Sequence, residues 1–495
     1  MRTEVIVVGA GPTGLMLAEE LTLAGIPVVV LEKQRTRSTQ SRAGGLQPRT
    51  AEILDLRGLL DPLLDRALPR GEFGGHFAGL PIELDCRSWR TRYPYPVSIP
   101  QARLEAFLEQ RLVDRGVPVL RGFEVSAIEP DSDGVTVGDI RGNYLVACDG
   151  GHSTIRKLLG VPFPGTTARM YSVVADITLA ARSATVRTSS EHFSRYFEFG
   201  GGFFSVLHPI EGELYRFIFG KLSAEKSDRD LPVTAEEVAE ALRAVCGPET
   251  ELGELRAASR FGDAARQLER YREGRVFFAG DAAHIHLPIG GQGVNLGIQD
   301  AVNLGWKLAA AVRGWAPAGL LDSYHTERHP VAARVLRTTR AQSLIMNPSQ
   351  DEDLATVRDI FTDLLRLPEA NHFVAGMMSG LDIQYTGLGP RMIDLDLSTP
   401  DGPTRVGRLL RSGRGLLLCL DGIPRSIDRW SDRVDQIVAE ADEGAATVLI
   451  RPDGYIAWSA TDTEPLETAL TRWFGAAAWS DARKENEVVA RTGYR

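Results

Sequence analysis

An acidic residue and a cluster of glycines stand between an apolar segment and a long helical pattern near the middle of the chain. The apolar run 275–279 predicts a buried parallel strand, and Asp281 follows its carboxyl end, where α/β sheets bind ligands. Three glycines within 290–293 then lead into a helix expected over 294–312. The first turn of a helix offers free N–H groups and the positive end of the helix dipole. These residues therefore predict a site for an anion, or for a negative charge that develops during a reaction.

The helix expected after these glycines carries small residues on one face. Gly297, Ala301, Gly305 and Ala309 recur every four residues and form a flat stripe. Because an interior glycine costs a helix about 1 kcal/mol relative to alanine, we expect close packing of this stripe against a neighbouring element to compensate. An ordinary strand–loop–helix unit with glycine turns is the alternative that these residues leave open.

The amino terminus contains a nucleotide-binding pattern in the context that this pattern requires. A strand expected over 4–8 is followed at once by GAGPTG at 9–14, which opens a helix over 15–24. In GxGxxG the first glycine allows a tight turn, the second lets the backbone approach a pyrophosphate, and the third permits close helix–strand packing. A second strand over 27–31 ends in Glu32, 23 residues after the first glycine, where a carboxylate accepts hydrogen bonds from a ribose 2′-OH. The pattern predicts an ADP-containing dinucleotide such as FAD or NAD.

Two further loops carry charged side chains. Arg42 lies in the loop 41–46, where it could pair with a phosphate or could be a solvated surface arginine. A second strand–Asp–Gly–Gly element, with Asp149 after the strand, opens a helix over 154–159. Ser153 is the expected N-cap of that helix.

Composition and charge argue against several classes of partner. The chain has 495 residues, 43% of them hydrophobic and 24% charged, so about two to four globular domains are expected. A net charge of −9 without a basic run argues against nucleic acid or an anionic membrane surface as a partner. The four cysteines are far apart, which predicts neither a metal site nor a disulfide framework and fits a reducing cytoplasm. No apolar run approaches the length of a membrane span.

A change of period marks the segment from about 171 to 260. Alternation replaces the parallel-strand signals there and predicts an antiparallel sheet. Nine Phe or Tyr residues occur within 27 consecutive positions of this segment, against 7% aromatic residues in the whole chain. Tyr215, Phe217 and Phe219 fall on one strand face, and together with Phe204 they are the residues that we expect to hold a flat aromatic ligand. The alternative is that these rings are ordinary sheet core.

The remaining segments predict helices and a separate carboxyl-terminal unit. Residues 72–99 are expected to form a hairpin excursion, and helices are expected over 320–344 and 351–378. The elements expected in the tail are strands at 415–420 and 434–438, a hairpin over 446–458 and a helix over 466–474. This order resembles a thioredoxin-like fold. Because Cys419 has no second cysteine beside it, the tail is not expected to exchange disulfides.

Three motifs together carry a family resemblance. They are GAGPTG with Glu32, CDGGHSTIR at 148–156, and GDAAHIHLPIGGQGVNLGIQDAVNLGWKL at 280–308. With these motifs the sequence resembles the single-component FAD-dependent aromatic hydroxylases of the para-hydroxybenzoate hydroxylase type. More narrowly, it is similar to bacterial aromatic-polyketide hydroxylases that act on angucyclines and anthracyclines, whose carboxyl-terminal thioredoxin-like domain lacks the redox cysteines. The segments 321–330 and 448–454 extend the match over nearly the whole chain.

The resemblance implies the ligands and the reaction. FAD would be the resident cofactor, NADPH or NADH the transient reductant, and O2 the second substrate. The organic substrate would be a polycyclic aromatic polyketide, hydroxylated by a flavin C4a-hydroperoxide from which water is excluded. A Baeyer–Villiger oxygenation, another flavoprotein activity such as that of a reductase, and a non-enzymatic nucleotide-binding role stay open. The WxWxIP motif of flavin halogenases does not occur in the sequence.

The resemblance also assigns residues to the cofactor, and no residue to a metal. It implies that Glu32 binds the adenosine ribose, that Asp281 binds the ribityl chain, and that a loop with Pro288 and Gly291 faces the flavin ring. The full set implied for the cofactor is Gly9, Gly11, Pro12, Thr13, Gly14, Glu32, Lys33, Arg42, Gln101, Val125, Asp149, Arg156, Asp281, Pro288, Gly291, Gln292, Gly293, Val294 and Asn295.

Proton transfer and reductant preference are left open by the sequence. No general base is identified; His208, His284 and His286 are the candidates, and for each a structural role is the alternative. The sequence departs from its relatives in a shortened hairpin within 137–144 and in His152, which stands where Arg or Ser is common. Both departures leave the choice between NADPH and NADH open.

The fold class that these segments predict is α/β with an α+β middle domain. A Rossmann-like FAD-binding domain is expected to carry an inserted antiparallel-sheet substrate domain and a carboxyl-terminal thioredoxin-like domain. The expected boundaries are 1–75, 100–170 and 262–345 for the FAD-binding domain, 76–99 and 171–261 for the substrate domain, 346–390 for a helical connector, and 391–495 for the thioredoxin-like domain. A cytoplasmic enzyme is expected, with a homodimer left open.

Overall fold

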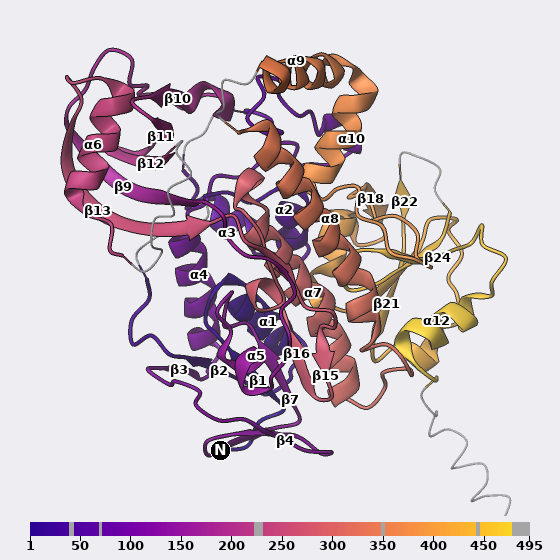
Figure 1. Cartoon of the computed structure of the whole chain (residues 1–495). Coiled ribbons are helices and arrows are strands. Elements are labelled where there is room, and N and C mark those ends of the chain that lie inside the picture. The colour runs from indigo at the N-terminus through magenta and orange to yellow at the C-terminus, as the bar shows by residue number, and fades with distance from the viewer. Residues whose placement is uncertain (39–43, 69–71, 222–230, 348–351, 442–445, 478–495) are drawn as a thin grey trace, which may run out of the picture.

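The computed structural model describes residues 1–38, 44–68, 72–221, 231–347, 352–441 and 446–477. Arg42, one of the residues expected at the cofactor, lies outside these ranges. Figure 1 shows a curved sheet with α6 at one end of the molecule, a helix-covered sheet in the middle, and a carboxyl-terminal unit beside the long helices α7 and α8.

A six-stranded sheet lies at the centre of the amino-terminal region, in the order β15-β16-β7-β1-β2-β3. Its strands are Arg272–Glu273, Val276–Phe278, Tyr144–Ala147, Val5–Val8, Val28–Glu32 and Val119–Arg121. β1 pairs in parallel with β2 and β7, and β16 pairs in parallel with β7. The apolar runs are buried on both faces, as in parallel sheets that helices cover. The carboxyl ends of these strands bring Gly9, Glu32, Asp149 and Asp281 to one edge of the sheet.

The helices α1 (Pro12–Leu23) and α7 (Gln292–Val312) pack closely on one another. A Cβ on Gly297 would lie 2.1 Å from Thr13 Oγ1, and a Cβ on Gly305 would lie 2.6 Å from Glu20 Cβ. The close packing that the small-residue stripe predicts is therefore confirmed, and its partner is the helix that follows the GxGxxG loop.

An antiparallel sheet forms the middle of the chain, as the alternation predicts. Its order is β10-β11-β12-β9-β13, with strands Phe197–Gly200, Phe203–Glu211, Leu214–Lys221, Tyr171–Ala181 and Glu251–Gly262. Helix α6 (Ala235–Cys246) lies against one face of this sheet (Figure 1). Because neighbouring residues of a strand point to opposite faces, each strand offers one set of side chains to α6 and another to the opposite side.

The excursion before the second half of the nucleotide-binding region has little regular structure. Within 72–99 the structure describes an isolated antiparallel bridge between Gly75 and Leu84 in place of two paired strands. The predicted hairpin is therefore wrong. Apolar side chains of the excursion, among them Phe77 and Leu84, pack with the helices α8, α9 and α10. His76 also stacks on Phe193, near the edge of the middle sheet.

Between α7 and the carboxyl-terminal unit the structure describes three helices, where the sequence predicts two. They are α8 (Ser323–Ile345), α9 (Glu352–Arg366) and α10 (Pro368–Ser379). Pro368 separates the last two, because it disfavours the helical conformation at the preceding residue; Leu367 has ψ 128°. Pro368 then occupies the first position of α10, where its missing N–H costs nothing.

The carboxyl-terminal unit contains the elements that the sequence predicts, at nearly the same bounds. Strands β20 (Gly415–Cys419), β21 (Val434–Val438), β23 (Val448–Ile450) and β24 (Ile456–Ser459) form a sheet of order β21-β20-β23-β24, and α12 spans Leu466–Phe474. β20 and β21 are parallel, whereas the other pairs are antiparallel. A smaller sheet contains β19 (Gly402–Arg405), β18 (Asp396–Thr399) and β22 (Glu440–Ala441).

The remaining helices and strands connect the sheets described above. They are α2 (Pro48–Asp55), α3 (Leu60–Leu64), α4 (Gln101–Asp114), α5 (Thr154–Leu158), α11 (Val406–Leu409), β4 (Glu129–Pro130), β5 (Val135–Val137), β6 (Ile140–Gly142), β8 (Gly165–Thr166), β14 (Ala265–Gln267) and β17 (His284–Ile285). Among the helices that the structure describes, none combines the length and the apolar character needed to cross a bilayer.

Candidate functional site

The three glycines of the first loop have the three distinct environments that a pyrophosphate-binding turn needs. Gly9 has φ +107°, and a Cβ there would lie 2.3 Å from the carbonyl oxygen of Cys148. A Cβ on Gly14 would lie 2.0 Å from the carbonyl oxygen of Gly9, so only glycine lets the helix start this close to the strand. A Cβ on Gly11 would meet no heavy atom within 4 Å. The loop is therefore tight on its protein side and open where a phosphate would approach.

The carboxylate of Glu32 is oriented by backbone donors. The N–H of Ala10 donates to Oε2 and the N–H of Gln34 donates to Oε1, both over 2.8 Å. The first of these bonds ties the end of β2 to the glycine loop. Glu32 is half-buried beside that loop, whereas Lys33 is exposed. This placement suits a ribose hydroxyl held next to a pyrophosphate.

The second acidic motif caps a helix and leaves one oxygen without a protein partner. Asp149 Oδ2 accepts from the N–H groups of Thr154 (2.6 Å) and Ile155 (3.1 Å), while Oδ1 is buried with no partner among the described residues. Ser153 Oγ accepts from the N–H of Arg156 at 3.1 Å, which confirms the expected N-cap. An unpartnered buried carboxylate oxygen beside the glycine loop fits a site that a hydroxyl-bearing ligand completes.

Arg156 connects two loops of the site. Its guanidinium donates to the carbonyl oxygens of Ala282 (3.0 Å) and Gly151 (2.8 Å), and it lies 3.8 Å above the ring of Phe163. Burial lowers the pKa of this side chain. In the structure Arg156 therefore holds the Asp149 loop against the Asp281 segment through carbonyl groups.

Asp281 and His286 lie together at the first turn of α7. Asp281 is exposed at the end of its strand, and its Oδ1 lies 3.9 Å from the position of a Cβ on Gly293. His286 donates from Nδ1 to the carbonyl oxygen of Leu287 at 2.8 Å, and burial lowers its pKa. The neutral ring then offers Nε2 as an acceptor, and this buried atom has no partner among the described residues. Two acceptors therefore face the first turn of α7, an arrangement that suits a polyhydroxyl chain.

A buried ionic cluster fixes the segment that carries Asp281. Asp300 accepts from the N–H of Gly280 (3.1 Å), from His284 Nε2 (2.8 Å) and from Arg328 Nε (2.7 Å). Burial opposes the charge of Asp300, but Arg328 and His284 outweigh it and hold its pKa below the usual value. His284 thus has the structural role that the sequence left open for it.

The loop before α7 is held by side-chain amides. Gly290 and Gly291 have φ +72° and +62°. Gln47 donates its N–H to Asn295 Oδ1 (2.7 Å) and its Nε2 to the carbonyl oxygen of Gly290 (2.9 Å). Asn295 Nδ2 donates to the carbonyl oxygens of Gly291 (2.7 Å) and Gly45 (3.3 Å). Sequence reasoning missed Gln47, because a lone glutamine before a helix proline carries no chemical signal.

Three of the four expected substrate residues lie on the face of the middle sheet that packs against α6. Tyr215, Phe217 and Phe219 are buried against α6, in a cluster that includes Val238 and Leu242. Phe217 is 0% exposed. The strand alternation was predicted correctly, but the sequence does not say which face meets the helix. These rings are sheet core, and their assignment to a substrate pocket is corrected here.

The opposite face of this sheet carries a charged pair and the remaining aromatic residue. Arg216 donates from Nε and Nη2 to the two oxygens of Asp176, at 2.9 and 3.1 Å, and lies opposite His208 in the ladder. Its Nη1 lies 3.7 Å from the position of a Cβ on Gly44. Half-buried Phe204 shares this face. Arg216 was overlooked in the sequence, although an arginine between two aromatic residues of a predicted strand was a signal that could have identified it.

Several expected cofactor residues have other surroundings in the structure. Gln101 begins α4 and donates to Glu105 Oε1 at 2.7 Å, while Val125 belongs to the core of the nucleotide-binding region. Gln292 donates to the carbonyl oxygen of Met378 at 3.2 Å. Pro288 is exposed ahead of α7.

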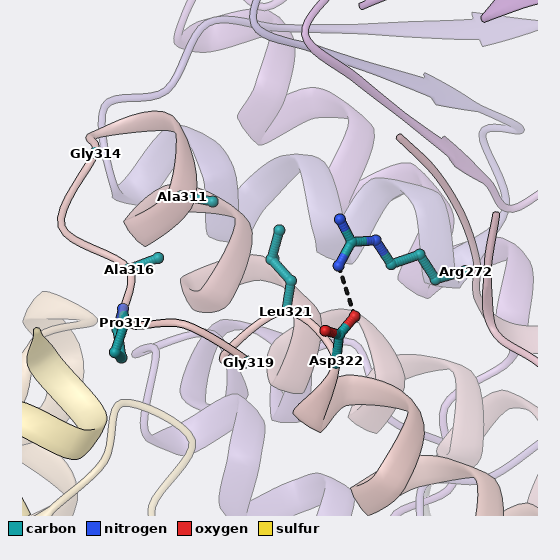
Figure 2. A pocket seen from close by; sticks show the side chains of 8 residues that line it. All are labelled: Arg272, Ala311, Gly314, Ala316, Pro317, Gly319, Leu321 and Asp322. Atoms are coloured by element: carbon teal, nitrogen blue, oxygen red, sulfur yellow. Dashed lines mark hydrogen bonds and ion pairs between the residues drawn. The ribbon is translucent and has the colours of Figure 1, made fainter. Parts of the chain in front are cut away.

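Two cavities lie outside the edge where these loops meet. Figure 2 shows one of about 270 Å3 at the far end of α7, with the Arg272–Asp322 ion pair (2.6 Å) on one side. The 21 residues of α7 span about 30 Å, so this cavity is remote from Gln292. The other, of about 700 Å3, runs along α4 past Arg103 and Phe107. Neither is lined by residues expected at the cofactor.

Two family models match the chain over most of its length. One, described as an FAD binding domain, matches residues 2–339, and the other, described as the C-terminal domain of aromatic-ring hydroxylases, matches residues 385–477. The chain belongs to the FAD-dependent aromatic-ring hydroxylases. It is an FAD-dependent monooxygenase, and NAD(P)H is the reductant typical of its family.

The matches to similar proteins extend over nearly the whole chain. The structure of OxyS, an anhydrotetracycline hydroxylase from Streptomyces rimosus, is 42% identical, covers 97% of this chain and 100% of its own, and has a TM-score of 0.88. CabE, an aromatic hydroxylase from angucycline biosynthesis, is 39% identical over 96% of this chain and 99% of its own, with a TM-score of 0.85. A dialkyldecalin synthase from Streptomyces rugosporus is 39% identical over 97% of this chain and 100% of its own.

Proposed function

We propose that this monooxygenase hydroxylates a polycyclic aromatic polyketide. Two of the similar proteins are an anhydrotetracycline hydroxylase and an aromatic hydroxylase from angucycline biosynthesis. The observation that carries the proposal is the position of Arg216 and Phe204, on the sheet face opposite α6, with Arg216 beside the loop that leads to Gln47. That face combines an aromatic ring with the Arg216–Asp176 ion pair, which suits a flat ligand bearing phenolic hydroxyl groups.

The residues at the strand ends fit FAD. We propose that Gly11 faces the pyrophosphate, that Glu32 binds the adenosine ribose, and that Asp281 with His286 binds the ribityl hydroxyls. Bound flavin would supply the activation of O2 and the transfer of one oxygen atom. The free N–H groups at the start of α7 stabilise negative charge in front of the glycine loop. The half-buried sheet face around Phe204 keeps water from the reacting carbon.

The experiment that tests this function follows NAD(P)H oxidation by the purified flavoprotein with a panel of polycyclic phenols. We expect a true substrate to accelerate oxidation while little of the reducing power appears as hydrogen peroxide. Oxidation that no phenol accelerates would argue against the proposed substrate class.

A second function is favoured by one relative. The dialkyldecalin synthase is named for the formation of a ring system, and its name mentions no oxygenation. We therefore keep ring formation without net oxidation as the alternative, next to the Baeyer–Villiger reaction, which would use the same residues. A ring-forming enzyme would convert its substrate without consuming NAD(P)H. NAD(P)H consumption therefore distinguishes hydroxylation from ring formation.

We propose that the carboxyl-terminal unit is a thioredoxin-like domain without redox function. The sheet order β21-β20-β23-β24 and the helix α12 support the fold, although the connection between β20 and β21 has only a short 3-10 turn, Asp428–Trp430. Cys419 is buried, and burial raises the pKa of its thiol. The domain boundaries stated from the sequence remain part of this proposal; each of the three main bodies has its own apolar cluster, and α7 contributes Trp306 and Ala310 to that of the carboxyl-terminal unit.

The redox-inactive tail gives a direct prediction. Replacing Cys419 with serine should leave turnover unchanged, because a lone thiol cannot complete a dithiol cycle. Steady-state NAD(P)H oxidation with and without a phenolic substrate is the measurement. A tenfold or greater drop in a variant that melts at the wild-type temperature would show that the thiol takes part in the reaction.

We propose a homodimer that pairs through α9. Apolar side chains on its outer face are exposed, among them Ile360 (55%) and Leu364 (44%) (Figure 1 shows α9 at the rim of the molecule). The first turn is acidic, with Glu352 and Asp353, and the last turn carries Arg366. Antiparallel pairing of two copies about a two-fold axis would cover the apolar face and place opposite charges together.

Replacing Ile360 with aspartate should convert this dimer to a monomer. The side chain is exposed within one chain, so the variant should still fold, and sedimentation velocity reports the mass. The matched control replaces Val113, an apolar residue 54% exposed on α4, with aspartate and should leave the dimer intact. A wild-type chain that sediments as a monomer at micromolar concentration would refute the proposed assembly.

The remaining partners and the location are proposed from composition. The net charge of −9 argues against nucleic acid and anionic membranes as partners. All four cysteines are free buried thiols, which fits the reducing cytoplasm.

A further inference from the structure

The turn between β23 and β24 of the carboxyl-terminal domain is buried inside the rest of the molecule. Arg451, Asp453 and Tyr455 are 0%, 3% and 3% exposed. Turns normally lie at the surface, because their backbone groups need solvent or specific partners. Here the partners come from the FAD-binding domain, so the turn is integrated into that domain.

One set of contacts runs from this turn to the glycine loop before α7. Arg49 on α2 donates from Nη2 to the carbonyl oxygen of Asp453 at 3.0 Å, and its guanidinium lies 5.0 Å from the ring centre of Tyr455. Gln47 caps the same helix and holds both Asn295 and the carbonyl oxygen of Gly290. Arg49, which contacts the turn, and Gln47, which holds the glycine loop, are therefore only two positions apart at the start of α2.

A second set of contacts reaches the strand end that carries Asp281. The ring of Tyr455 lies 4.4 Å from that of Tyr385. Arg328 donates to the hydroxyl of Tyr385 at 3.0 Å and to Asp300 at 2.7 Å. Asp300 in turn accepts from the N–H of Gly280 at 3.1 Å. Two different series of intervening residues thus connect the turn to both loops that would hold the flavin.

Buried charges fix the position of the turn itself. Arg451 donates to both oxygens of Glu327 on α8, at 2.7 and 2.8 Å, and Glu327 also binds Lys307 at 2.9 Å. Arg451 also binds Asp453 within the turn. Moving one member of this buried set away would leave a charge without its partner, which is strongly destabilising. The ion pairs therefore hold the turn in one position.

We propose that the Arg451–Tyr455 turn is a positioning element of the flavin site, through which the carboxyl-terminal domain sets the geometry of the loop before α7. Arg49 is the positioning residue with the shortest connection to that loop. The inference depends on FAD binding by this chain and not on the identity of its substrate, so a failure of the substrate assignment leaves it standing.

The first test compares Arg49 variants with a variant of Arg405 on β19, whose partner Asp55 is at the other end of α2. Arg49→Met should weaken FAD binding roughly 10- to 100-fold, the range seen when groups that orient binding side chains are removed, and shift the visible absorption of the bound flavin. Arg49→Lys should restore part of both, because an ammonium group can still donate to Asp453. Arg405→Met removes an interdomain pair with Asp55 (2.7 Å), which lies at the end of α2 that is farther from Gln47. It should lower the melting temperature but leave the flavin spectrum and dissociation constant unchanged.

The second test uses the unmodified holoprotein and does not depend on any variant folding. Three tryptophans of the carboxyl-terminal domain, Trp430, Trp458 and Trp473, share an apolar cluster with Trp306 on α7, and their fluorescence reports on the structure of that cluster. During a urea titration we expect the bound flavin to lose its native spectrum at the concentration where these tryptophans become exposed. A native flavin spectrum that persists after the tryptophan signal is lost would overturn the proposal. So would Arg49→Met and Arg405→Met variants with the same flavin spectrum and the same FAD affinity.

Discussion

Replacing Phe217 with alanine should lower the free energy of unfolding by about 3–5 kcal/mol and leave the coupling of NAD(P)H oxidation to hydroxylation unchanged. Phe217 is 0% exposed, its ring lies 4.8 Å from that of Phe219, and both pack between the sheet and α6. Truncation leaves a cavity on the side of the sheet that faces away from the flavin loops. Urea unfolding measures the first quantity, and peroxide formed per NAD(P)H consumed measures the second.

Phe204 provides the matched control, because it lies in the same sheet but on the opposite, half-buried face. Phe204→Ala should cost less stability than Phe217→Ala and should raise the peroxide fraction, since it opens the substrate side to water. If Phe217→Ala instead melted like the wild type and released more peroxide, the assignment of the two sheet faces would have to be reversed.

Replacing Asp281 with alanine should weaken FAD binding by about 1–3 kcal/mol, the cost of leaving a buried hydroxyl without its acceptor. Each 1.4 kcal/mol is about a tenfold change in the dissociation constant, so the purified variant should contain little flavin at micromolar concentrations. The measurement is titration of apoprotein with FAD, followed by quenching of flavin fluorescence. Because Asp281 is exposed in the chain alone, the fold should be unaffected.

Asp322→Ala is the control for this experiment. Asp322 is also an exposed aspartate, but it pairs with Arg272 at the far end of α7, beside the cavity of Figure 2. Its loss should leave FAD affinity at the wild-type value. Equal flavin stoichiometry in both variants would show that the end of β16 does not contact the ribityl chain.

The strand ends were predictable because their signals are local. Buried runs followed at once by glycine or aspartate fix where a parallel strand stops, and parallel strands put those ends on one edge. Gly9, Glu32 and Asp281 were therefore located by sequence alone. The small-residue stripe of α7 likewise indicated a close neighbour, although it could not name α1.

The parts that failed depend on contacts between distant segments. Alternation showed that Tyr215 and Phe217 share one face of the strand and that Arg216 lies on the other face. Only the position of α6 decides which of the two faces belongs to the core. Gln47 and Asn295 meet across 248 residues, and amide side chains give no periodic signal. The hairpin that contains Asp453 was predicted but its burial was not, since its partner Arg49 lies on another domain.

The most direct test of the central claim is the mass of the product formed from a polycyclic phenol by the purified flavoprotein with NAD(P)H and isotopically labelled O2. The account predicts a product heavier by one oxygen atom that carries the label, formed with consumption of one NAD(P)H, and stable to mild base as a phenol should be. A product of unchanged mass, formed without NAD(P)H, would contradict hydroxylation and favour ring formation. A labelled product that opens in base would assign the Baeyer–Villiger reaction instead.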